Sequence, residues 1–387
     1  MNIIYLDNAA TTPVAEEVIK DMMPYYTENW GNPSSIHSSG QKAATAINNA
    51  RETVANFLGA LSSEIIFTGG GTESDNLAII GAARANLKKG KHIITSAIEH
   101  HAVTHPLEYL SKHEGYEITY LPVNSNGIVD PEDLKKAIRP DTVICTIMHA
   151  NNEIGVIEPI SELGAICKEN DVIMHTDAVQ SCGHIPTLVK ELNVDMLSLS
   201  AHKFYGPKGI GALYLKKGTR LQPLIHGGGH ERNKRSGTEN VPGIVGLKTA
   251  VELAREKMGN ESIIQAKLRD KLMDGLVNDI PDSAVTGSRD KRLPNNASII
   301  VKYIEGESML LHLDMYGIAA SSGSACTSGS LEPSHVLLAI GVPVEFAHGS
   351  LRFSFGRNSK ESDVDAVIDV LPGIVKNLRS MSPFKAE

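Results

Sequence analysis

The fold of this chain is constrained most by an alternation of short apolar and amphipathic segments between about residues 90 and 215. The apolar segments have the length and composition of buried strands and lie at 92–96, 117–123, 143–149, 172–178, 195–200 and 210–216. Helical patterns lie between them at 106–113, 131–138 and 159–170. Strands joined through helices by short connections form a mainly parallel sheet covered on both faces. We therefore expect an α/β protein whose ligands bind at the carboxyl ends of the strands.

A second, smaller unit is expected after this sheet. A long helical pattern near 243–279 leads to apolar stretches at 295–304 and 350–357, which indicate strands of an α+β unit. The length of 387 residues is sufficient for two domains. We predict a large domain at residues 15–258 and a small domain made of residues 1–14 and 259–387.

Composition excludes several classes of protein. With 41% hydrophobic and 21% charged residues, the chain can bury a core and is not disordered. Its net charge of −8 argues against a nucleic-acid partner, which requires a basic face. No stretch approaches the ~18 uninterrupted apolar residues of a membrane helix, and the first residues lack a secretory signal. We expect a cytoplasmic protein without nucleic-acid or membrane partners.

The four cysteines fall into two groups. Cys145, Cys167 and Cys182 lie in apolar or helical settings and are expected to be core residues. No C-x-x-C pair occurs, which excludes zinc-ribbon and ferredoxin patterns. Cys326 lies instead in SSGSACTSGS at 321–330, a run of small polar residues that cannot bury a core. This setting indicates an exposed, reactive thiol on a flexible loop.

A glycine-rich turn precedes a predicted helix. The sequence GGGTES at 69–74 follows an apolar run and is followed by a helical pattern. Glycines before a helix start leave backbone N–H groups free to face an anion, and the helix N-terminus favours negative charge. The turn is neither a P-loop nor a G-x-G-x-x-G motif. It indicates either a phosphate-binding site or a plain turn and cap.

Two strand ends carry residues that packing does not require. Asp177 ends an apolar segment, where a carboxylate requires either a cationic partner or a role as an N-cap. Lys203 follows the segment 195–200 and is either a surface lysine or an amine able to form a Schiff base. Together with the glycine-rich turn, these residues are the three protein parts that pyridoxal phosphate requires. The turn would anchor its phosphate, Asp177 would pair with its ring nitrogen, and Lys203 would carry its aldehyde.

The chain also resembles a known family over residues 6 to about 379. The resemblance is to the cysteine desulfurases, pyridoxal-phosphate enzymes of the aspartate-aminotransferase fold type in the class V aminotransferase branch. The motifs that carry it are LDNAATTP (6–13), GNPSSIH (31–37), GGGTESDN (69–76), IEHHAV (98–103), ANNEIG (150–155), TDAVQ (176–180), SAHKFYGPKG (200–209), HGGGHERNKRSGTEN (226–240) and SSGSACTSGSLEPSH (321–335). The last motif resembles the long-loop group of the family.

The resemblance implies a role for each cofactor contact. Lys203 would form the Schiff base, and Asp177 and Gln180 would hold the pyridine nitrogen and the phenolic oxygen. His100 would stack on the ring and take part in catalysis. The other expected cofactor contacts are Gly71, Thr72, Asn152, Ser200, His202 and, from the neighbouring subunit of a homodimer, Thr238.

The resemblance also implies the reaction. L-cysteine would become L-alanine, Lys203 would remove the α-proton, and the Cys326 thiolate would take the sulfur as a persulfide. Arg352 would clamp the substrate carboxylate, a task suited to a planar two-pronged donor, and Asn152 would help to hold the substrate. The sulfur would pass to an iron–sulfur scaffold protein or another acceptor. Cys326 is also a candidate transient ligand of iron in such a cluster.

Three alternative functions differ from this one in the residues that they require. An aminotransferase or selenocysteine lyase on the same fold would need no thiol at position 326. A metallohydrolase is suggested by the i, i+4 pairs His101/His105 and His226/His230, but no H-E-x-x-H motif occurs. A catalytically inactive sulfur carrier would not need Lys203.

Overall fold

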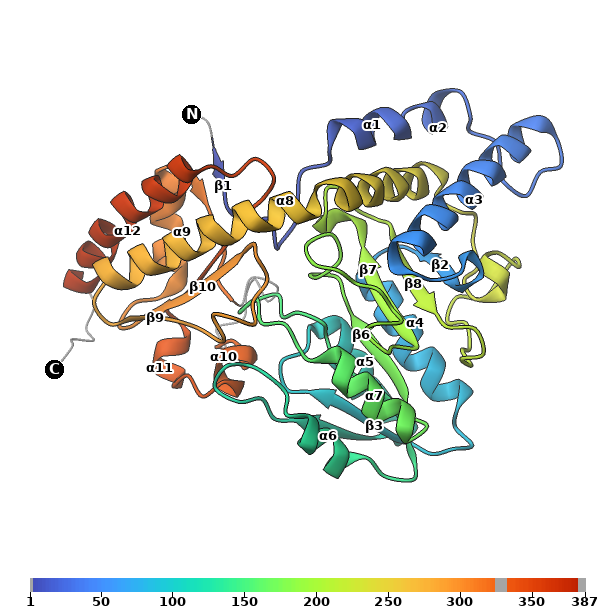
Figure 1. Cartoon of the computed structure of the whole chain (residues 1–387), viewed down its shortest axis with the longest axis horizontal. Helices are drawn as coiled ribbons and strands as arrows, with labels where there is room; N and C mark the ends of the chain where they lie inside the picture. The colour runs from blue at the N-terminus through green and yellow to red at the C-terminus, as the bar shows by residue number, and fades with distance from the viewer. Residues whose placement is uncertain (1–2, 324–332, 382–387) are drawn as a thin grey trace.

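Seven strands form the central sheet in the computed structural model, which describes residues 3–323 and 333–381 (Figure 1). Their spatial order is β2-β8-β7-β6-β5-β3-β4, in which β8 runs antiparallel to both neighbours and the other pairs are parallel. The strands are β2 (Ile65–Thr68), β3 (His92–Ser96), β4 (Glu117–Leu121), β5 (Thr142–Thr146), β6 (Ile173–Asp177), β7 (Met196–Ser200) and β8 (Gly211–Leu215). All six predicted strands are confirmed, with small shifts at their ends.

Helices cover both faces of this sheet, so the α/β prediction is confirmed. In β2, Ile65 and Phe67 pack on one face and Ile66 on the other, as the two-residue period of a strand requires. The face of the sheet that carries Ile66 packs against α4 (Gly71–Ala85) and α5 (His101–Glu114). The opposite face packs against α3 (Ser38–Leu58), α6 (Pro131–Ala137), α7 (Ile160–Glu169) and the first half of α8 (Val241–Asp279).

A second unit is built on a three-stranded antiparallel sheet in the order β12-β10-β9. The predicted strands at 295–304 and 350–357 correspond to β10 and β12 and are confirmed. The elements of this unit are β9 (Ser283–Val285), β10 (Asn296–Val301), β12 (Ser350–Ser354), the parallel pair β1 (Ile4–Tyr5) and β11 (Ile318–Ala319), α9 (Gly306–Met315), α10 (His335–Ala339), α11 (Val344–Ala347) and α12 (Glu361–Met381). Two short helices, α1 (Glu16–Met22) and α2 (Pro24–Thr27), precede α3.

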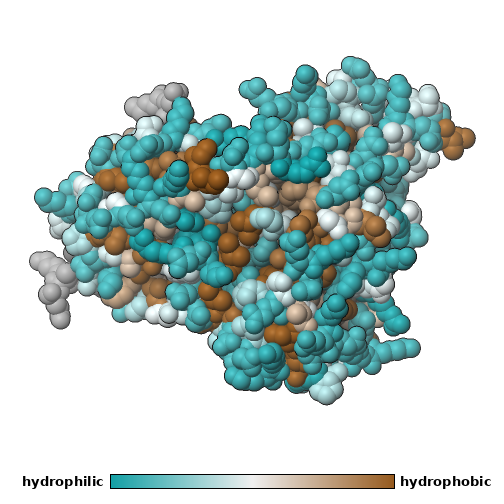
Figure 2. Space-filling view, viewed as in Figure 1, coloured by the Kyte–Doolittle hydropathy of each residue, from teal (hydrophilic) through white to brown (hydrophobic). Residues whose placement is uncertain are grey.

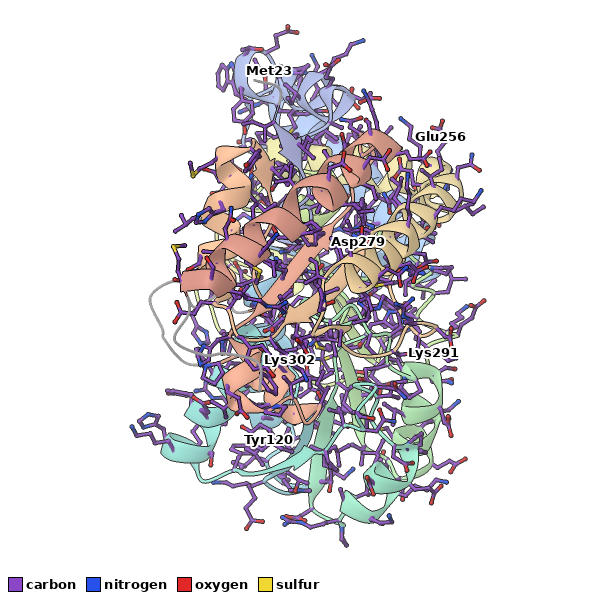
Figure 3. All side chains as sticks on the ribbon, turned by 90° about the vertical axis from the view of Figure 1, so that its left-hand side faces the viewer. Met23, Tyr120, Glu256, Asp279, Lys291 and Lys302 are labelled. Carbon is purple, nitrogen blue, oxygen red and sulfur yellow. The ribbon has the colours of Figure 1, made fainter. Side chains whose placement is uncertain are left out.

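Helix α8 connects the two units without a break (Figures 1 and 3). Its residues 241–254 enter the core of the central sheet, and its residues 268–276 enter the core of the second unit. Figure 3 shows the second half, from Glu256 to Asp279, running beside α12. The predicted boundary between residues 258 and 259 lies inside this helix and stays a prediction.

A further apolar cluster lies between the two units. It joins residues of loops after β3 and β5, such as Ile98 and Met148, to Ile300 of β10 and to Val336 and Leu337 of α10. Because these loops leave the carboxyl ends of parallel strands, the second unit packs beside the edge of the sheet where ligands are expected.

The structure bears on the expected burial of three cysteines and on the question of membrane-spanning helices. Cys145, Cys167 and Cys182 are fully buried, as predicted. Within the described residues, no helix is long and apolar enough to cross a membrane.

Candidate active site

The predicted site residues gather where the strands end, around a short N-terminal segment at residues 7–12. The carbonyl oxygen of Ala9 accepts hydrogen bonds from Gln180 Nε2 at 3.0 Å and from Lys203 Nζ at 2.7 Å. Lys203 Nζ also donates to the carbonyl oxygen of Ala10 at 2.8 Å. His202 pairs with Thr11 Oγ1 at 3.1 Å. The N-terminal segment therefore fixes three predicted cofactor residues against one another.

Asp177 is a buried carboxylate near the Lys203 amine. It is 5% exposed, and its Oδ1 accepts a hydrogen bond from the Val179 N–H at 2.8 Å. Burial raises the pKa of Asp177 to about 6, while the Val179 hydrogen bond and the Lys203 charge oppose that rise. A carboxylate held this way gains from a positively charged N–H partner, which the protonated pyridine nitrogen would supply.

A second buried acid lies behind Asp177. Asp75 of α4 is 1% exposed, and neither of its carboxyl oxygens has a hydrogen-bond partner among the described residues. Its Oδ1 lies 3.6 Å from Nε2 of His175, a fully buried ring that also contacts Ser198 Oγ at 3.0 Å. Burial, followed by the nearby charge of Asp177, raises the pKa of Asp75 well above its usual range. Both acids of this pair have raised pKa values, and the burial of Asp75 disfavours its ionised form.

The glycine-rich turn forms a cradle at the start of α4. Gly70 has φ 148°, and α4 begins at Gly71. A Cβ on Gly71 would lie 2.6 Å from Val179 Cγ2, so glycine leaves room for the chain that follows Asp177. The turn borders a cavity of about 890 Å³ lined by Ala10, Thr11, Gly69, Gly70, Gly71, Thr72, Glu73, Asn76, Ser200, His202, Lys208 and Gly209. A helix N-terminus beside this cavity suits a phosphate group.

His100 lies at the N-cap of α5, directly after the loop that follows β3. Its Nδ1 accepts a hydrogen bond from the Ala102 N–H at 3.0 Å, so the ring proton is on Nε2. Burial and then the charge of Lys203 lower the pKa of His100 to about 4. The ring is therefore neutral near pH 7 and offers one N–H donor.

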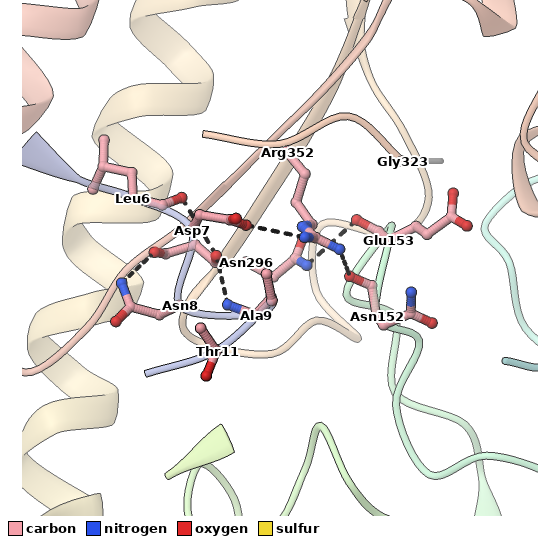
Figure 4. A network of polar contacts seen from close by, with 12 residues as sticks. Leu6, Asp7, Asn8, Ala9, Thr11, Asn152, Glu153, Asn296, Gly323 and Arg352 are labelled. Carbon is pink, nitrogen blue, oxygen red and sulfur yellow. Dashed lines mark hydrogen bonds and ion pairs between the residues drawn. The ribbon is translucent and has the colours of Figure 1, made fainter. Parts of the chain in front are cut away.

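Arg352 projects from β12 of the second unit toward the same N-terminal segment (Figure 4). Its Nη1 donates to the carbonyl oxygen of Asn152 at 2.9 Å, and its Nη2 donates to Asp7 Oδ1 at 3.1 Å. Arg352 is 2% exposed, yet its Nε is buried without a hydrogen-bond partner among the described residues. An unpaired guanidinium N–H is a ready donor for a carboxylate ligand.

These features fit pyridoxal phosphate with an amino-acid substrate. The α4 cradle matches a phosphate, Asp177 matches the ring nitrogen, Lys203 supplies an amine, and the free N–H of Arg352 matches a carboxylate.

Two predicted residues are not brought into this arrangement. Thr238 is exposed and does not line the cavity at the α4 cradle. Cys326, with most of its predicted loop at 321–330, lies outside the described residues.

The sequence reasoning assigned no role to several acidic residues that the structure places at the site. They are Asp7, Asp75, Glu99 and Glu153. Each of these acids lies inside or next to one of the sequence motifs given above. The presence of an ionisable residue in such a motif could therefore have indicated a place at the site.

One of the two histidine pairs considered as metal ligands packs ring against ring, and His230 of the other pair contacts Glu239 at 2.9 Å. His101 stacks on His105 with ring centres 4.8 Å apart and approaches His335 at 5.4 Å. Among the residues that the structure describes, no group of three or more His, Cys, Asp or Glu side chains is placed to hold a metal ion.

Comparison with known proteins identifies the family. Residues 4–367 match the family model described as aminotransferase class-V. The cysteine desulfurase IscS of Dictyoglomus turgidum is 57% identical over 384 residues, which cover 99% of this chain and 97% of that protein. A solved structure described as a NifS-like protein superposes with a TM-score of 0.91 at 40% identity, covering 97% of this chain and 100% of that one. A solved structure described as SspA in complex with cysteine superposes with a TM-score of 0.81 at 40% identity, covering 91% of this chain and 98% of that one.

The chain belongs to the aminotransferase class-V family. Within it, the chain is a cysteine desulfurase that depends on pyridoxal phosphate, with the fold of the aspartate-aminotransferase type. The recognition, fold, enzyme class and cofactor predicted from the sequence are thereby confirmed.

Proposed function

We propose that this site converts L-cysteine to L-alanine and leaves the sulfur as a persulfide on Cys326. One observation carries the assignment of the residues. The segment at 7–10 binds Lys203 through two carbonyl oxygens and Arg352 through Asp7, so one short segment holds both an amine and a guanidinium group. A structural neighbour that is 40% identical is described as a complex with cysteine, which supports the same substrate here.

The roles of the residues follow from their contacts. When bound, pyridoxal phosphate supplies an electron sink that stabilises negative charge at the substrate's Cα. Lys203 Nζ takes the α-proton, and the ionised Asp177 holds the proton on the ring nitrogen. Arg352 orients the substrate through its carboxylate, with Asn152 beside it. The neutral His100 offers its Nε2–H to the site.

The sulfur transfer balances without another reactant. The Cys326 thiolate forms an S–S bond to the substrate sulfur while the bond between that sulfur and Cβ breaks. The electron pair of the broken bond stays on Cβ, which takes a proton and becomes the alanine methyl group. Carbon is reduced, and the two sulfurs are oxidised to the persulfide level. The persulfide would then pass its sulfur to an acceptor in iron–sulfur cluster assembly.

We propose further that the enzyme is a cytoplasmic homodimer. Thr238 is exposed and stands apart from the cavity of its own subunit, which supports a role at the phosphate of a neighbouring subunit. The segment before it is held by a buried ion pair, Arg51 with Glu231, at 2.6 Å. Trp30 and Ile36 are 74% and 94% exposed, and Figure 2 shows hydrophobic side chains at the outer end of the α2–α3 region on an otherwise mostly hydrophilic face. Three buried free thiols suit a reducing compartment.

The proposed function is tested by incubating the purified holoenzyme with L-cysteine. Alanine and protein-bound persulfide should form in equal amounts in the first turnover, with the persulfide on the peptide that contains Cys326. Alanine without persulfide, or persulfide on another peptide, would contradict the proposal.

Asp177→Asn is expected to slow exchange of the substrate α-proton by at least about a hundredfold, because a neutral amide cannot hold the ring proton. The phosphate contacts persist, so the cofactor should remain bound. The measurement is exchange of the α-proton of L-alanine in D₂O, followed by NMR.

Asp75→Asn is the matched control for that variant. It replaces a neighbouring buried acid, whose pKa is raised by burial, with an amide of the same size, so most of the exchange should remain. Unchanged exchange in Asp177→Asn would remove Asp177 from the mechanism.

Arg352→Lys is expected to raise the KM for L-cysteine by roughly ten- to a hundredfold, the effect of losing one hydrogen bond to a charged group. Lysine keeps the charge but cannot reproduce the planar fork that contacts Asn152, Asp7 and the substrate. Steady-state kinetics give KM, and cofactor absorbance checks that the site is intact. A KM equal to that of the wild type would show that Arg352 does not bind substrate.

A further inference from the structure

Glu153 is a buried acid that connects the two ends of the cysteine-bearing segment. It is 6% exposed and follows Asn152 in the loop after β5. Its Oε2 accepts a hydrogen bond from Ser334 Oγ at 2.5 Å. On the other side, Gly323 packs so closely that an added Cβ would lie 2.6 Å from the same Oε2. Figure 4 shows Gly323 and Glu153 beside Arg352 and Asn152.

Both ends of this segment are fixed by further contacts. The Gly323 N–H donates to Ser350 Oγ at 3.2 Å, and Ser321 exchanges two backbone hydrogen bonds with Arg352 at 2.7 and 3.1 Å. At the other end, Ser334 is the N-cap of α10, where its Oγ accepts from the Leu337 N–H at 3.3 Å. The Ser334 hydroxyl therefore accepts from α10 and donates to Glu153.

Covalent geometry gives this anchoring a consequence for sulfur transfer. Cys326 follows Gly323 by only three residues, and three residues span at most roughly 11 Å. Ser321, two residues before Gly323, is paired with the backbone of Arg352, the proposed ligand of the substrate carboxylate. The position of Gly323 therefore limits how far the backbone of Cys326 can lie from Gly323.

The placement of Glu153 is not explained by an ion pair. No cationic side chain among the described residues lies within ion-pairing distance of its carboxylate. Burial raises the pKa of Glu153 to about 7, against the Ser334 hydrogen bond and the Arg352 charge, which lower it. Burying an acid at this cost without a cationic partner is unfavourable for stability alone.

We propose that Glu153 is a positioning residue for the reaction: its carboxyl group bonds Ser334 and packs against Gly323, and this arrangement favours an approach of the Cys326 thiol to the substrate bound by Arg352. This inference rests on the proposed role of Cys326 as the sulfur acceptor.

The test compares Glu153→Ala, Glu153→Gln and Ser334→Ala in the holoenzyme, using single-turnover persulfide formation on Cys326. Glu153→Ala should slow this step by about ten- to a hundredfold, the range expected when a reacting group is misplaced. The KM for L-cysteine and the cofactor absorbance should stay close to those of the wild type. Glu153→Gln should restore most of the rate because its amide oxygen still accepts from Ser334. Ser334→Ala should share the defect of Glu153→Ala.

Glu158→Ala is the matched control for loss of a buried acid. Glu158 is 3% exposed, and its Oε2 accepts from the Val129 N–H at 2.9 Å, so its removal should lower Tm without slowing persulfide formation. If Glu153→Ala loses its cofactor or does not fold, Ser334→Ala decides, because it removes a single hydroxyl. Wild-type persulfide rates in Ser334→Ala would overturn the inference. Absence of persulfide on Cys326 in the wild-type enzyme would instead overturn the proposed function.

Discussion

Lys203→Ala is expected to lower alanine formation from L-cysteine by roughly a thousandfold or more, the upper part of the range for losing a general base. The Lys203 amine lies between the carbonyl oxygens of Ala9 and Ala10 and close enough to Asp177 to affect its charge. Without this amine, the site lacks the group that we assign to take the α-proton and to release the product. The cofactor should still bind through the α4 cradle and Asp177.

Two measurements separate loss of chemistry from loss of the cofactor. Cofactor content is measured by absorbance after desalting, and alanine is measured in a single turnover with excess L-cysteine. Lys190→Ala is the matched control, since this exposed lysine lies on the loop between β6 and β7 and should leave both values unchanged. Alanine formation by Lys203→Ala near the wild-type rate would show that another residue is the base.

The large sheet could be predicted from the sequence because each of its strands and helices is indicated by a pattern within a short stretch of the chain. The central strands β3, β5 and β7 are short, fully buried runs with several apolar residues each, and the helices between the strands have clear amphipathic patterns. Asp177 and Lys203 could be predicted as site residues in the same way, from their places along the sequence relative to the strands. Asp177 ends β6 and Lys203 follows β7, and parallel strands present their carboxyl ends at one edge of the sheet. The strands β1, β9 and β11, with two or three residues each, are too short to show alternation.

The contacts that complete the site could not be predicted because they join distant parts of the chain. Arg352 meets Asn152 across 200 residues and Asp7 across 345 residues. Glu153 meets Ser334 across 181 residues. No periodicity or spacing rule connects such pairs, and family resemblance supplied the role of Arg352 but none for Glu153. The buried Nε of Arg352 and the buried carboxyl oxygens of Asp75, which have no hydrogen-bond partner among the described residues, can be recognised only when the burial and the partners of each atom are known.

The buried thiols are poor candidates for carrying the sulfur. Cys145, Cys167 and Cys182 are fully buried in the core of the large sheet. Hydrogen bonding from Cys167 and burial raise the pKa of Cys145 well above its usual range, and burial raises that of Cys182 to about 12. Because the thiolate is the nucleophile, thiols that stay protonated in an apolar core react slowly. Cys326, in its run of small polar residues, is the remaining cysteine of the chain.

Cys326→Ser is expected to remove persulfide formation while cofactor binding and α-proton exchange are retained. Serine is nearly isosteric, but its hydroxyl stays protonated near neutral pH and offers no comparable nucleophile for the substrate sulfur. The measurement is persulfide labelling after a single turnover, followed by mass mapping of the labelled peptide. Cys182→Ser is the matched control and should keep the full label, because its thiol is buried and protonated. Full labelling of a core cysteine that persists in Cys326→Ser would show that Cys326 does not carry the sulfur.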